Sequence, residues 1–387
     1  MTKRIDSVLS TGIERGQAPG CVAMVVDRTS TRYSSAFGVR DLATAAPMQV
    51  DTMFRLASMT KAITSAAAMQ LVERGKLTLD TPVANVLPEF GALGVLTGFY
   101  GDTPAIRPPS HPVTLRHLLT HTSGLGYEFW SAPLTQWLKV TGTPGILSGQ
   151  LSTLRTPLLH DPGAAWTYGR GTDWVGRMVE TTSGQTLDTY VQHHLLTPLG
   201  MHETSFDPSP ALTARMAGLA TRDASGGLAP LPFEWPAGHE LWNGGHRLHS
   251  TAADYARLLQ MLLNGGTFHG ARVLESNTVE RMGQNHIGDL WVTNLKTVQP
   301  AYTNDAEFFP GMRKKHGLGY MINCEQWPNR RAIGSGCWAG VFNTYFWFDP
   351  AHGLAGLLMT QVLPFADHGT MALLDAFEEA VYTEFGR

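Results

Sequence analysis

Ser58 and Lys61 are the residues of this chain whose types and spacing most directly suggest chemistry. They begin and end the tetrapeptide Ser58-Met59-Thr60-Lys61. Residues three apart on a helix share a face, so the lysine amine can reach the serine hydroxyl. A hydroxyl becomes a nucleophile when a base takes its proton, and a helix N-terminus stabilises a developing alkoxide. The spacing therefore predicts a serine nucleophile with a lysine base.

The residues around Lys61 strengthen this interpretation. Four-residue patterns of common amino acids arise by chance, so the tetrapeptide alone is weak evidence. Lys61, however, is flanked by Ala62, Ile63 and Ala66, where a charged side chain is unusual without a partner or a purpose. The alternative is a lysine whose amine extends from the helix face to water.

The elements that must position this pair follow from hydrophobic periodicity and turn residues. Ser58 begins a largely buried helix that ends near Gly75, and the N-terminal residues form an amphipathic helix. Further helices are predicted over 114–119, 173–182, 187–196, 251–263 and 371–385, and strands over 20–27, 31–38, 317–323, 331–333, 341–349 and 354–361.

The order of these elements predicts an α/β (α+β) protein with two parts. Residues 1–76 and 241–387 are expected to form one discontinuous domain, an antiparallel sheet with helices on its faces. Residues 77–240 are expected to form an inserted, mostly helical second lobe. A site should lie in a cleft between the two.

Composition excludes several classes of function. The chain has 387 residues, 43% hydrophobic and 16% charged, which is enough apolar material for a large core. Its net charge of -3 and scattered basic residues argue against nucleic acid, and no apolar run is long enough to span a membrane. The partner is expected to be a small molecule, and the sequence does not predict the oligomeric state.

The N-terminus and the cysteines indicate the compartment. The chain enters its first helical pattern without the apolar segment of a secretory signal. The odd, widely spaced Cys21, Cys324 and Cys337 suggest reduced thiols. We therefore expect a cytoplasmic protein.

Two other hydrolase types are disfavoured. No serine has glycine two places before and after it, so the elbow of α/β-hydrolases is absent. Neither His202-Glu203 nor His239-Glu240 is completed to the H-E-x-x-H pattern of a zinc enzyme. No metal and no cofactor are expected.

Three segments together carry a resemblance to a known family: residues 54–61, 71–80 (Leu-Val-Glu-Arg-Gly-Lys-Leu-Thr-Leu-Asp) and 115–125 (Leu-Arg-His-Leu-Leu-Thr-His-Thr-Ser-Gly-Leu). The chain resembles the serine β-lactamase superfamily from about residue 5 to 385. Within it, the chain is most similar to family VIII carboxylesterases and the related class C β-lactamases and D-alanyl peptidases. The resemblance implies a β-lactamase-like fold and catalysis through an acyl-enzyme.

The resemblance also assigns a tyrosine. The family's second motif follows a Pro-Gly turn, and Asp161-Pro-Gly-Ala-Ala-Trp-Thr-Tyr168-Gly-Arg170 matches that setting. Tyr168 is implied to be the second proton carrier, which passes the serine proton to the leaving group. Arg170 stands where relatives have asparagine, and it is expected either to bind a substrate carboxylate or to face solvent.

The third motif is Lys-Thr-Gly or His-Thr-Gly in lactam-hydrolysing relatives and is Trp338-Ala339-Gly340 here. These three residues are expected to bind substrate, and the indole replaces a cation by an apolar wall, which favours uncharged esters. The same alignment implies an oxyanion hole formed by the N–H groups of Ser58 and Val341.

Other residues near these motifs have weaker assignments. Tyr127, Phe129 and Trp130 are expected to line the site, either as core packing or as an acyl pocket. His121 is predicted to be a packed, hydrogen-bonded histidine, and His246 to be a surface histidine.

The sequence therefore predicts a serine carboxylesterase acting on small, short-chain, largely uncharged esters. One alternative is an acyltransferase, because residues 115–127 and 161–174 also resemble fungal statin side-chain acyltransferases. The others are a β-lactamase or D-alanyl peptidase and a catalytically silent binding protein.

Overall fold

An antiparallel sheet joins the two ends of the chain in the computed structural model, which describes residues 2–386. Its strands are β1 (Gly20–Asp27), β2 (Thr31–Asp41), β3 (Ala46–Pro47), β12 (Lys314–His316), β13 (Met321–Asn323), β14 (Gly336–Gly340), β15 (Thr344–Asp349) and β16 (Leu354–Met359). Their spatial order is β12-β13-β14-β15-β16-β1-β2-β3. The pairing of β1 with β16 connects the N-terminal hairpin to the C-terminal strands.

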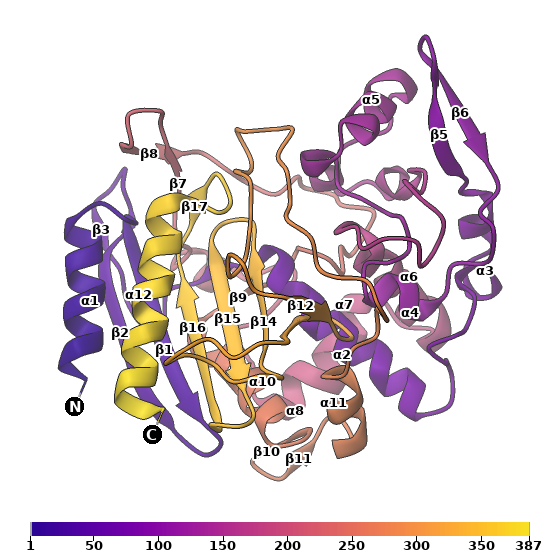
Figure 1. Ribbon diagram of the computed structural model, residues 1–387. Coiled ribbons are helices and arrows are strands. Elements are labelled where there is room, and N and C mark those ends of the chain that lie inside the picture. The colour runs from indigo at the N-terminus through magenta and orange to yellow at the C-terminus, as the bar shows by residue number, and fades with distance from the viewer. Residues whose placement is uncertain (1, 387) are drawn as a thin grey trace.

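Helices cover both faces of this sheet. They include α1 (Lys3–Glu14), α10 (Ala252–Leu263) and α12 (His368–Phe385). Consecutive strand residues point to opposite faces, and on β15 Phe346 packs against Tyr255 of α10, whereas Trp347 packs against Phe377 of α12. Helices α10 and α12 therefore lie on opposite faces, and Figure 1 shows α1 and α12 side by side over one of them.

The central helix carries the predicted base. A short 3-10 turn, η1 (Ala57–Met59), leads into α2 (Thr60–Glu73), in which residues 60–71 are all buried. Burial on every side places this helix in the core and confirms the prediction of a largely buried helix after Ser58. Gly75, with φ of +66°, follows its end, where a left-handed conformation favours glycine.

The middle of the chain supplies short helices and two hairpins. The helices are α3 (Val83–Val86), α4 (Leu115–Leu119), α5 (Ala132–Thr141), α6 (Gly171–Ser183), α7 (Leu187–Val191), α8 (Thr197–Leu199) and α9 (Pro210–Thr213), with a π-helical turn at Gln192–Leu196 and 3-10 turns at Pro88–Ala92, η3 (Glu128–Trp130), Ile146–Ser148 and Leu151–Leu154. The hairpins are β5 (Val95–Tyr100) with β6 (Thr103–Arg107), and β7 (Leu219–Arg222) with β8 (Leu228–Leu231).

Strand β7 also pairs in parallel with β17 (Val362–Leu363) near the C-terminus, so the middle segment contributes to packing beside the sheet. The division at residues 77 and 240 stays a prediction. The remaining elements are β4 (Phe54–Arg55) paired with β9 (His249–Ser250), β10 (Thr267–Phe268) paired with β11 (Ala271–Arg272), and α11 (Ser276–Met282).

Of three strand predictions near the C-terminal motif, one was wrong, and two were correct only in their C-terminal parts, Met321–Asn323 (β13) and Thr344–Asp349 (β15). Residues 317–323 contain a turn between β12 and β13, and residues 331–333 form a loop because the buried Arg331 pairs with Glu378 of α12. Trp338-Ala339-Gly340 lies within β14, and residues 341–343 form the turn to β15 instead of beginning a strand.

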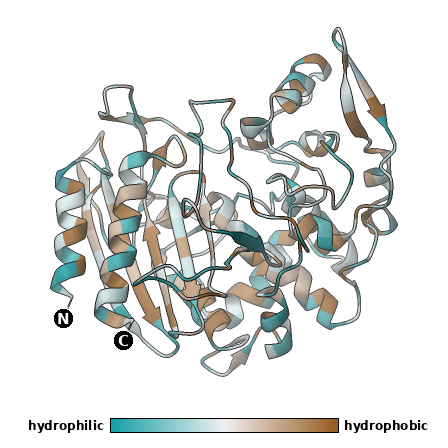
Figure 2. Ribbon diagram, viewed as in Figure 1, coloured by the Kyte–Doolittle hydropathy of each residue, from teal (hydrophilic) through white to brown (hydrophobic). Residues whose placement is uncertain are grey.

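Apolar residues concentrate on the central strands, whereas the outer helices alternate between polar and apolar residues (Figure 2). The core joins the sheet to α2, α6 and α10 as one cluster of buried side chains. Within residues 2–386, none of the helices combines the length and apolar character that a bilayer crossing requires.

Candidate active site

Ser58 lies in a turn that several backbone contacts hold in place. The Leu56 N–H donates to the Leu248 carbonyl (2.9 Å), and the Tyr255 hydroxyl donates to the Met59 carbonyl (2.9 Å). Ala57 has φ of +45°, an uncommon conformation for a residue with a Cβ atom. Backbone strain of this kind persists where surrounding contacts enforce it, and it leaves Ser58 partly exposed at the start of the buried helix.

Lys61 is only 1% exposed, and its amine makes three short contacts. Its Nζ atom lies 3.0 Å from Ser58 Oγ, 3.0 Å from the Tyr127 hydroxyl and 2.7 Å from the Gly245 carbonyl oxygen. The predicted serine-lysine pair is therefore within hydrogen-bonding distance, and two further groups fix the amine.

These contacts are suited to a base. A neutral amine has two N–H bonds and one lone pair. The Gly245 carbonyl can only accept a hydrogen bond, and Tyr127 can accept the second. When a neutral amine uses both N–H bonds in this way, its lone pair is the part left to face Ser58 Oγ. Burial raises the pKa of the Tyr127 phenol well above its ordinary value, so Tyr127 stays protonated.

Tyr168 lies beside this pair but is hydrogen-bonded to a different residue. Its ring centroid is 5.0 Å from Lys61 Nζ, and its hydroxyl oxygen accepts a hydrogen bond from the Trp338 indole N–H (3.1 Å). Because the oxygen accepts from Trp338, the phenolic proton remains available to donate elsewhere. The tyrosine that contacts the lysine amine directly is Tyr127.

The loop around Gly245 is held by a buried carboxylate. Asp173, in the first turn of α6, accepts a hydrogen bond from the Gly245 N–H (3.0 Å), and burial raises the pKa of its carboxyl. His246 was predicted to lie at the surface, and this was wrong. It is 6% exposed, its Nδ1 lies 3.7 Å from Asp173, and burial lowers its pKa well below the ordinary value.

Arg170 was expected to bind a substrate carboxylate or to face solvent, and it does neither. Its side chain is fully buried and pairs with Glu128 at 2.6 Å. Its other nitrogens donate to the carbonyl oxygens of Gly126 and Thr153. The guanidinium therefore neither faces solvent nor is free to meet a substrate carboxylate, and it ties the segment carrying Tyr127 to the segment carrying Tyr168.

The end of β14 packs directly against the nucleophile turn. A Cβ atom at Gly340 would lie 2.3 Å from the Leu56 carbonyl oxygen, so only glycine permits this approach. The Thr344 hydroxyl donates to the same carbonyl (3.3 Å). Val341, the first residue after β14, thus lies next to the segment that carries Ser58, and the buried Ala339 is within the strand. The predicted oxyanion hole remains an inference from this proximity.

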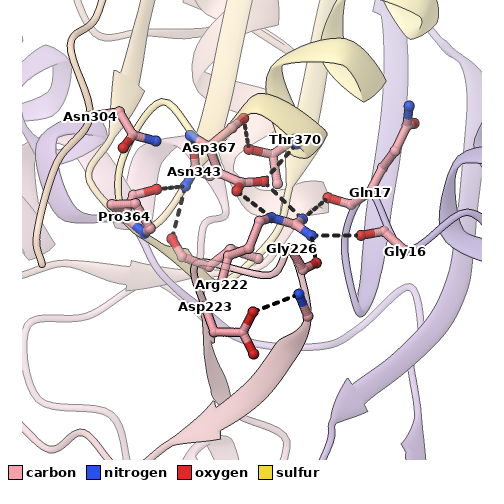
Figure 3. Close-up of polar contacts among 12 residues, drawn as sticks. Gly16, Gln17, Arg222, Asp223, Gly226, Asn304, Asn343, Pro364, Asp367 and Thr370 are labelled. Carbon is pink, nitrogen blue, oxygen red and sulfur yellow. Dashed lines mark hydrogen bonds and ion pairs between the residues drawn. The ribbon is translucent and has the colours of Figure 1, made fainter. Parts of the chain in front are cut away.

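Asn343 lies in the turn that also contains Val341, and its hydrogen bonds hold this turn against the C-terminal segment. Figure 3 shows Asn343 beside Pro364 and Asp367. Asn343 is fully buried, has φ of +61°, and its amide nitrogen donates to the carbonyl oxygens of Val362 (2.8 Å) and Pro364 (2.9 Å). Its side-chain oxygen accepts hydrogen bonds from the Tyr345 hydroxyl and the Asp367 N–H. Asp367 in turn pairs with Arg222, which also binds the carbonyl oxygens of Gly16, Gln17 and Gly226 (Figure 3).

Aromatic rings surround Tyr168. Its ring centroid lies 4.9 Å from Trp338, 5.4 Å from Tyr127 and 5.5 Å from Trp130. Phe129 packs against both Tyr127 and Trp130. Around the tyrosine, the site therefore presents mainly apolar and aromatic surface, as expected from Trp338.

His121 is packed as predicted. It is 3% exposed and contacts the ring of Tyr168 edge-on at 4.7 Å. Its expected hydrogen bond is not observed within residues 2–386, where Nδ1 has no partner. Burial, followed by His316 and Lys61, lowers its pKa well below the ordinary value, so the ring is neutral.

Sequence reasoning missed the hydrogen bonds of Tyr127, Gly245 and Asp173. Tyr127 was treated as a possible wall, and Asp173 was noted only as the start of a helix. A carboxylate beside Trp174 and Val175, near the start of a predicted helix, was the available signal for Asp173. The Gly245 contact uses a backbone atom, which no residue type reveals.

The fold and this serine-lysine arrangement define a β-lactamase-like protein of the serine hydrolase and acyltransferase superfamily. Consistent with this, the Beta-lactamase family profile matches residues 5–379, and the chain belongs to that family.

Curated relatives include both transferases and an esterase. The chain is 32% identical to monacolin J acid methylbutanoyltransferase of Aspergillus terreus, covering 98% of this chain and 95% of the relative. It is 31% identical to lovastatin esterase of Penicillium rubens, covering 98% of each. Among solved structures, unliganded simvastatin synthase (LovD) of Aspergillus terreus superposes with a TM-score of 0.83 at 31% identity, covering 99% of this chain and 98% of that one.

Proposed function

We propose that this protein cleaves uncharged carboxylic esters through an acyl-enzyme on Ser58. The observation that carries the proposal is the position of the Lys61 amine, which contacts with Gly245 and Tyr127 hold 3.0 Å from Ser58 Oγ. Lys61 takes the serine proton as Oγ attacks the ester carbonyl. The N–H groups of Ser58 and Val341 then stabilise the negative oxygen of the tetrahedral intermediate.

Tyr168 completes the first half of the reaction in this proposal. Its oxygen is held by the Trp338 N–H, and its own proton passes to the leaving alcohol as the carbon-oxygen bond breaks. Water then attacks the acyl-enzyme and gives a proton to the Tyr168 oxygen, and Lys61 returns its proton to Ser58 Oγ as the acid leaves. Small esters are the simplest substrates, because the indole of Trp338 replaces the cation that lactam-hydrolysing relatives use for a carboxylate.

Transfer of the acyl group to an alcohol is the second candidate. It is favoured by the 32% identity to a methylbutanoyltransferase over nearly the whole chain. Both outcomes share the same acyl-enzyme and differ in the molecule that resolves it. The aromatic surroundings of Tyr168 would favour an alcohol with an apolar body over water if they bind it close to Ser58.

The test is turnover of p-nitrophenyl acetate and butyrate beside a chromogenic cephalosporin, with mass spectrometry of the protein. We expect rapid ester turnover, little lactam turnover and an acyl adduct on Ser58 that is lost in Ser58→Ala. An adduct released mainly on addition of an alcohol would identify the transferase. Full activity of a folded Ser58→Ala protein would refute the nucleophile assignment. We propose a cytoplasmic location, and a small-molecule ester as the partner.

A further inference from the structure

A cavity of about 610 Å³ lies between the N-terminal half of α12 and the segment 305–310. This volume is within the range of cavities that hold small organic ligands. Its apolar lining includes Phe308, Phe309, Trp327, Ala366, Met371 and Leu374. None of these residues is part of the catalytic arrangement described above.

The charged residues of this cavity are mostly neutralised from outside. Four carboxylates line it, at Asp305, Glu307, Asp375 and Glu378. Three of them form ion pairs: Asp305 with Lys296, Asp375 with Arg330, and Glu378 with Arg331. A ligand therefore gains little from carrying a charge, and the aromatic and aliphatic lining favours an uncharged, apolar group.

Phe308 connects the cavity to the catalytic residues. Its ring lines the cavity and also lies 5.7 Å from the ring of Trp338, whose indole bonds Tyr168. A small space of about 20 Å³ lined by Phe308, Trp338 and Leu374 adjoins the same rings. The cavity is thus separated from the catalytic tyrosine by two aromatic side chains.

The wall formed by Phe309 is held in a strained conformation. Phe309 has φ of +53°, which is unusual for a bulky residue. Its ring packs edge-on against Trp327 at 5.0 Å and under the Arg331 guanidinium at 4.5 Å. The Lys314 amine donates to the Phe308 carbonyl, and its Nζ lies 3.4 Å from the Phe309 carbonyl oxygen. Contacts of this kind keep the wall in place without a ligand.

We propose that this cavity is a subsite for an uncharged apolar arm of the ester, which extends from Ser58 past Trp338 and Phe308. The inference rests on the proposed function and adds a substrate class to it: esters with one long aliphatic or aromatic arm. An acetyl group is too short to pass two rings, so the cavity affects only longer substrates.

Filling the cavity tests this directly. Ala372 lines the cavity and is exposed on α12, so Ala372→Trp adds an indole with little risk to the fold. Thr383→Trp, at an exposed position of the same helix outside the cavity, is the matched control. The substrates are p-nitrophenyl acetate and octanoate, which vary the acyl arm, and methyl and octyl acetate, which vary the alcohol arm.

We expect Ala372→Trp to lose at least tenfold in kcat/KM on one long-arm ester while its acetate turnover stays within twofold of Thr383→Trp. A loss on p-nitrophenyl octanoate would show that the acyl arm enters the cavity, and a loss on octyl acetate would show that the alcohol arm does. Equal retention of both long-arm esters would overturn the subsite. Failure of the proposed function would be distinct, because then even the unmodified protein would not turn over the acetates through Ser58.

Discussion

The Lys61 amine lies 3.0 Å from the Tyr127 hydroxyl, the same distance that separates it from Ser58 Oγ. A residue expected at most to line a pocket thus contacts the predicted base directly. The first prediction follows from this contact. Tyr127→Phe keeps the ring and removes the hydrogen-bond acceptor, so the amine can rotate away from Ser58.

We expect Tyr127→Phe to lower kcat about tenfold or more, equivalent to about 1.4 kcal/mol, with little change in KM or in the preference among esters. Steady-state kinetics across an acyl series measures this. Tyr320→Phe is the control, because the buried Tyr320 hydroxyl has no hydrogen-bond partner within the described residues. If Tyr127 serves only as an apolar wall, its variant should match that control.

The second prediction concerns Asn343. Asn343→Gly keeps the left-handed backbone but removes four side-chain hydrogen bonds, so we expect the free energy of unfolding to fall by about 2 to 4 kcal/mol. Asn343→Ala should lose about 1 kcal/mol more, because alanine is strained at φ of +61°.

The same variants should affect catalysis through the turn that carries Val341. We expect kcat to fall with KM nearly unchanged, because displacing this amide weakens stabilisation of the transition state more than binding of the substrate. Denaturant unfolding and ester kinetics give the two readouts. Wild-type kcat in a folded Asn343→Gly protein would argue against a role for this turn in catalysis.

The third prediction is a test of the buried ion pair. Arg170→Met leaves the Glu128 carboxylate buried without its partner, and this should cost about 3 to 5 kcal/mol of unfolding free energy. Adding Glu128→Leu should recover part of the loss, because the uncompensated charge is removed. Arg107→Met, which breaks the solvent-exposed pair with Asp161, should leave stability nearly unchanged. Equal effects of the two arginine variants would contradict the structural role of Arg170.

The fourth prediction is a pH dependence of stability. Burial lowers the pKa of His316 to about 4 from an ordinary value of 6.5. The unfolded chain therefore takes up a proton near pH 6.5, whereas the folded protein does not until about pH 4, so stability falls as the pH is lowered through this interval. Between pH 7.5 and 5 this group alone should account for roughly 2 kcal/mol.

Urea unfolding of the unmodified protein and of His316→Gln at both pH values measures this contribution. The variant should lose less unfolding free energy on acidification. Part of the loss should remain, because burial also lowers the pKa of His121. An identical loss in both proteins would show that His316 already titrates normally in the folded state.

Local patterns explain which parts of this molecule the sequence predicted. The pair of Ser58 and Lys61 depends on a spacing of three residues within one helix, and the hairpin at β1 and β2 depends on alternation and a polar turn. Strand β14 was missed as an element because two glycines reduce its β-propensity. Residues 331–333 were misassigned because Arg331 looks exposed until its partner Glu378 is known.

The contacts that complete the site could not be read from such patterns. Lys61 meets Tyr127 across 66 residues and Gly245 across 184, and these pairings depend on how the middle of the chain folds back onto α2. Arg170 was misplaced for the same reason, since its partner Glu128 lies 42 residues away.

The Gly245 carbonyl that orients Lys61 belongs to the main chain. Every amino acid has this carbonyl, so no single substitution at position 245 deletes the oxygen, although one can displace it. A Cβ atom there would lie 2.8 Å from the Asp173 carboxylate, which would limit even this displacement to variants that disturb α6. Substitutions can therefore change the contact of Lys61 with Tyr127, whereas its contact with Gly245 is largely protected from them. Selection for a weaker or altered base should act through position 127 and leave position 245 intact.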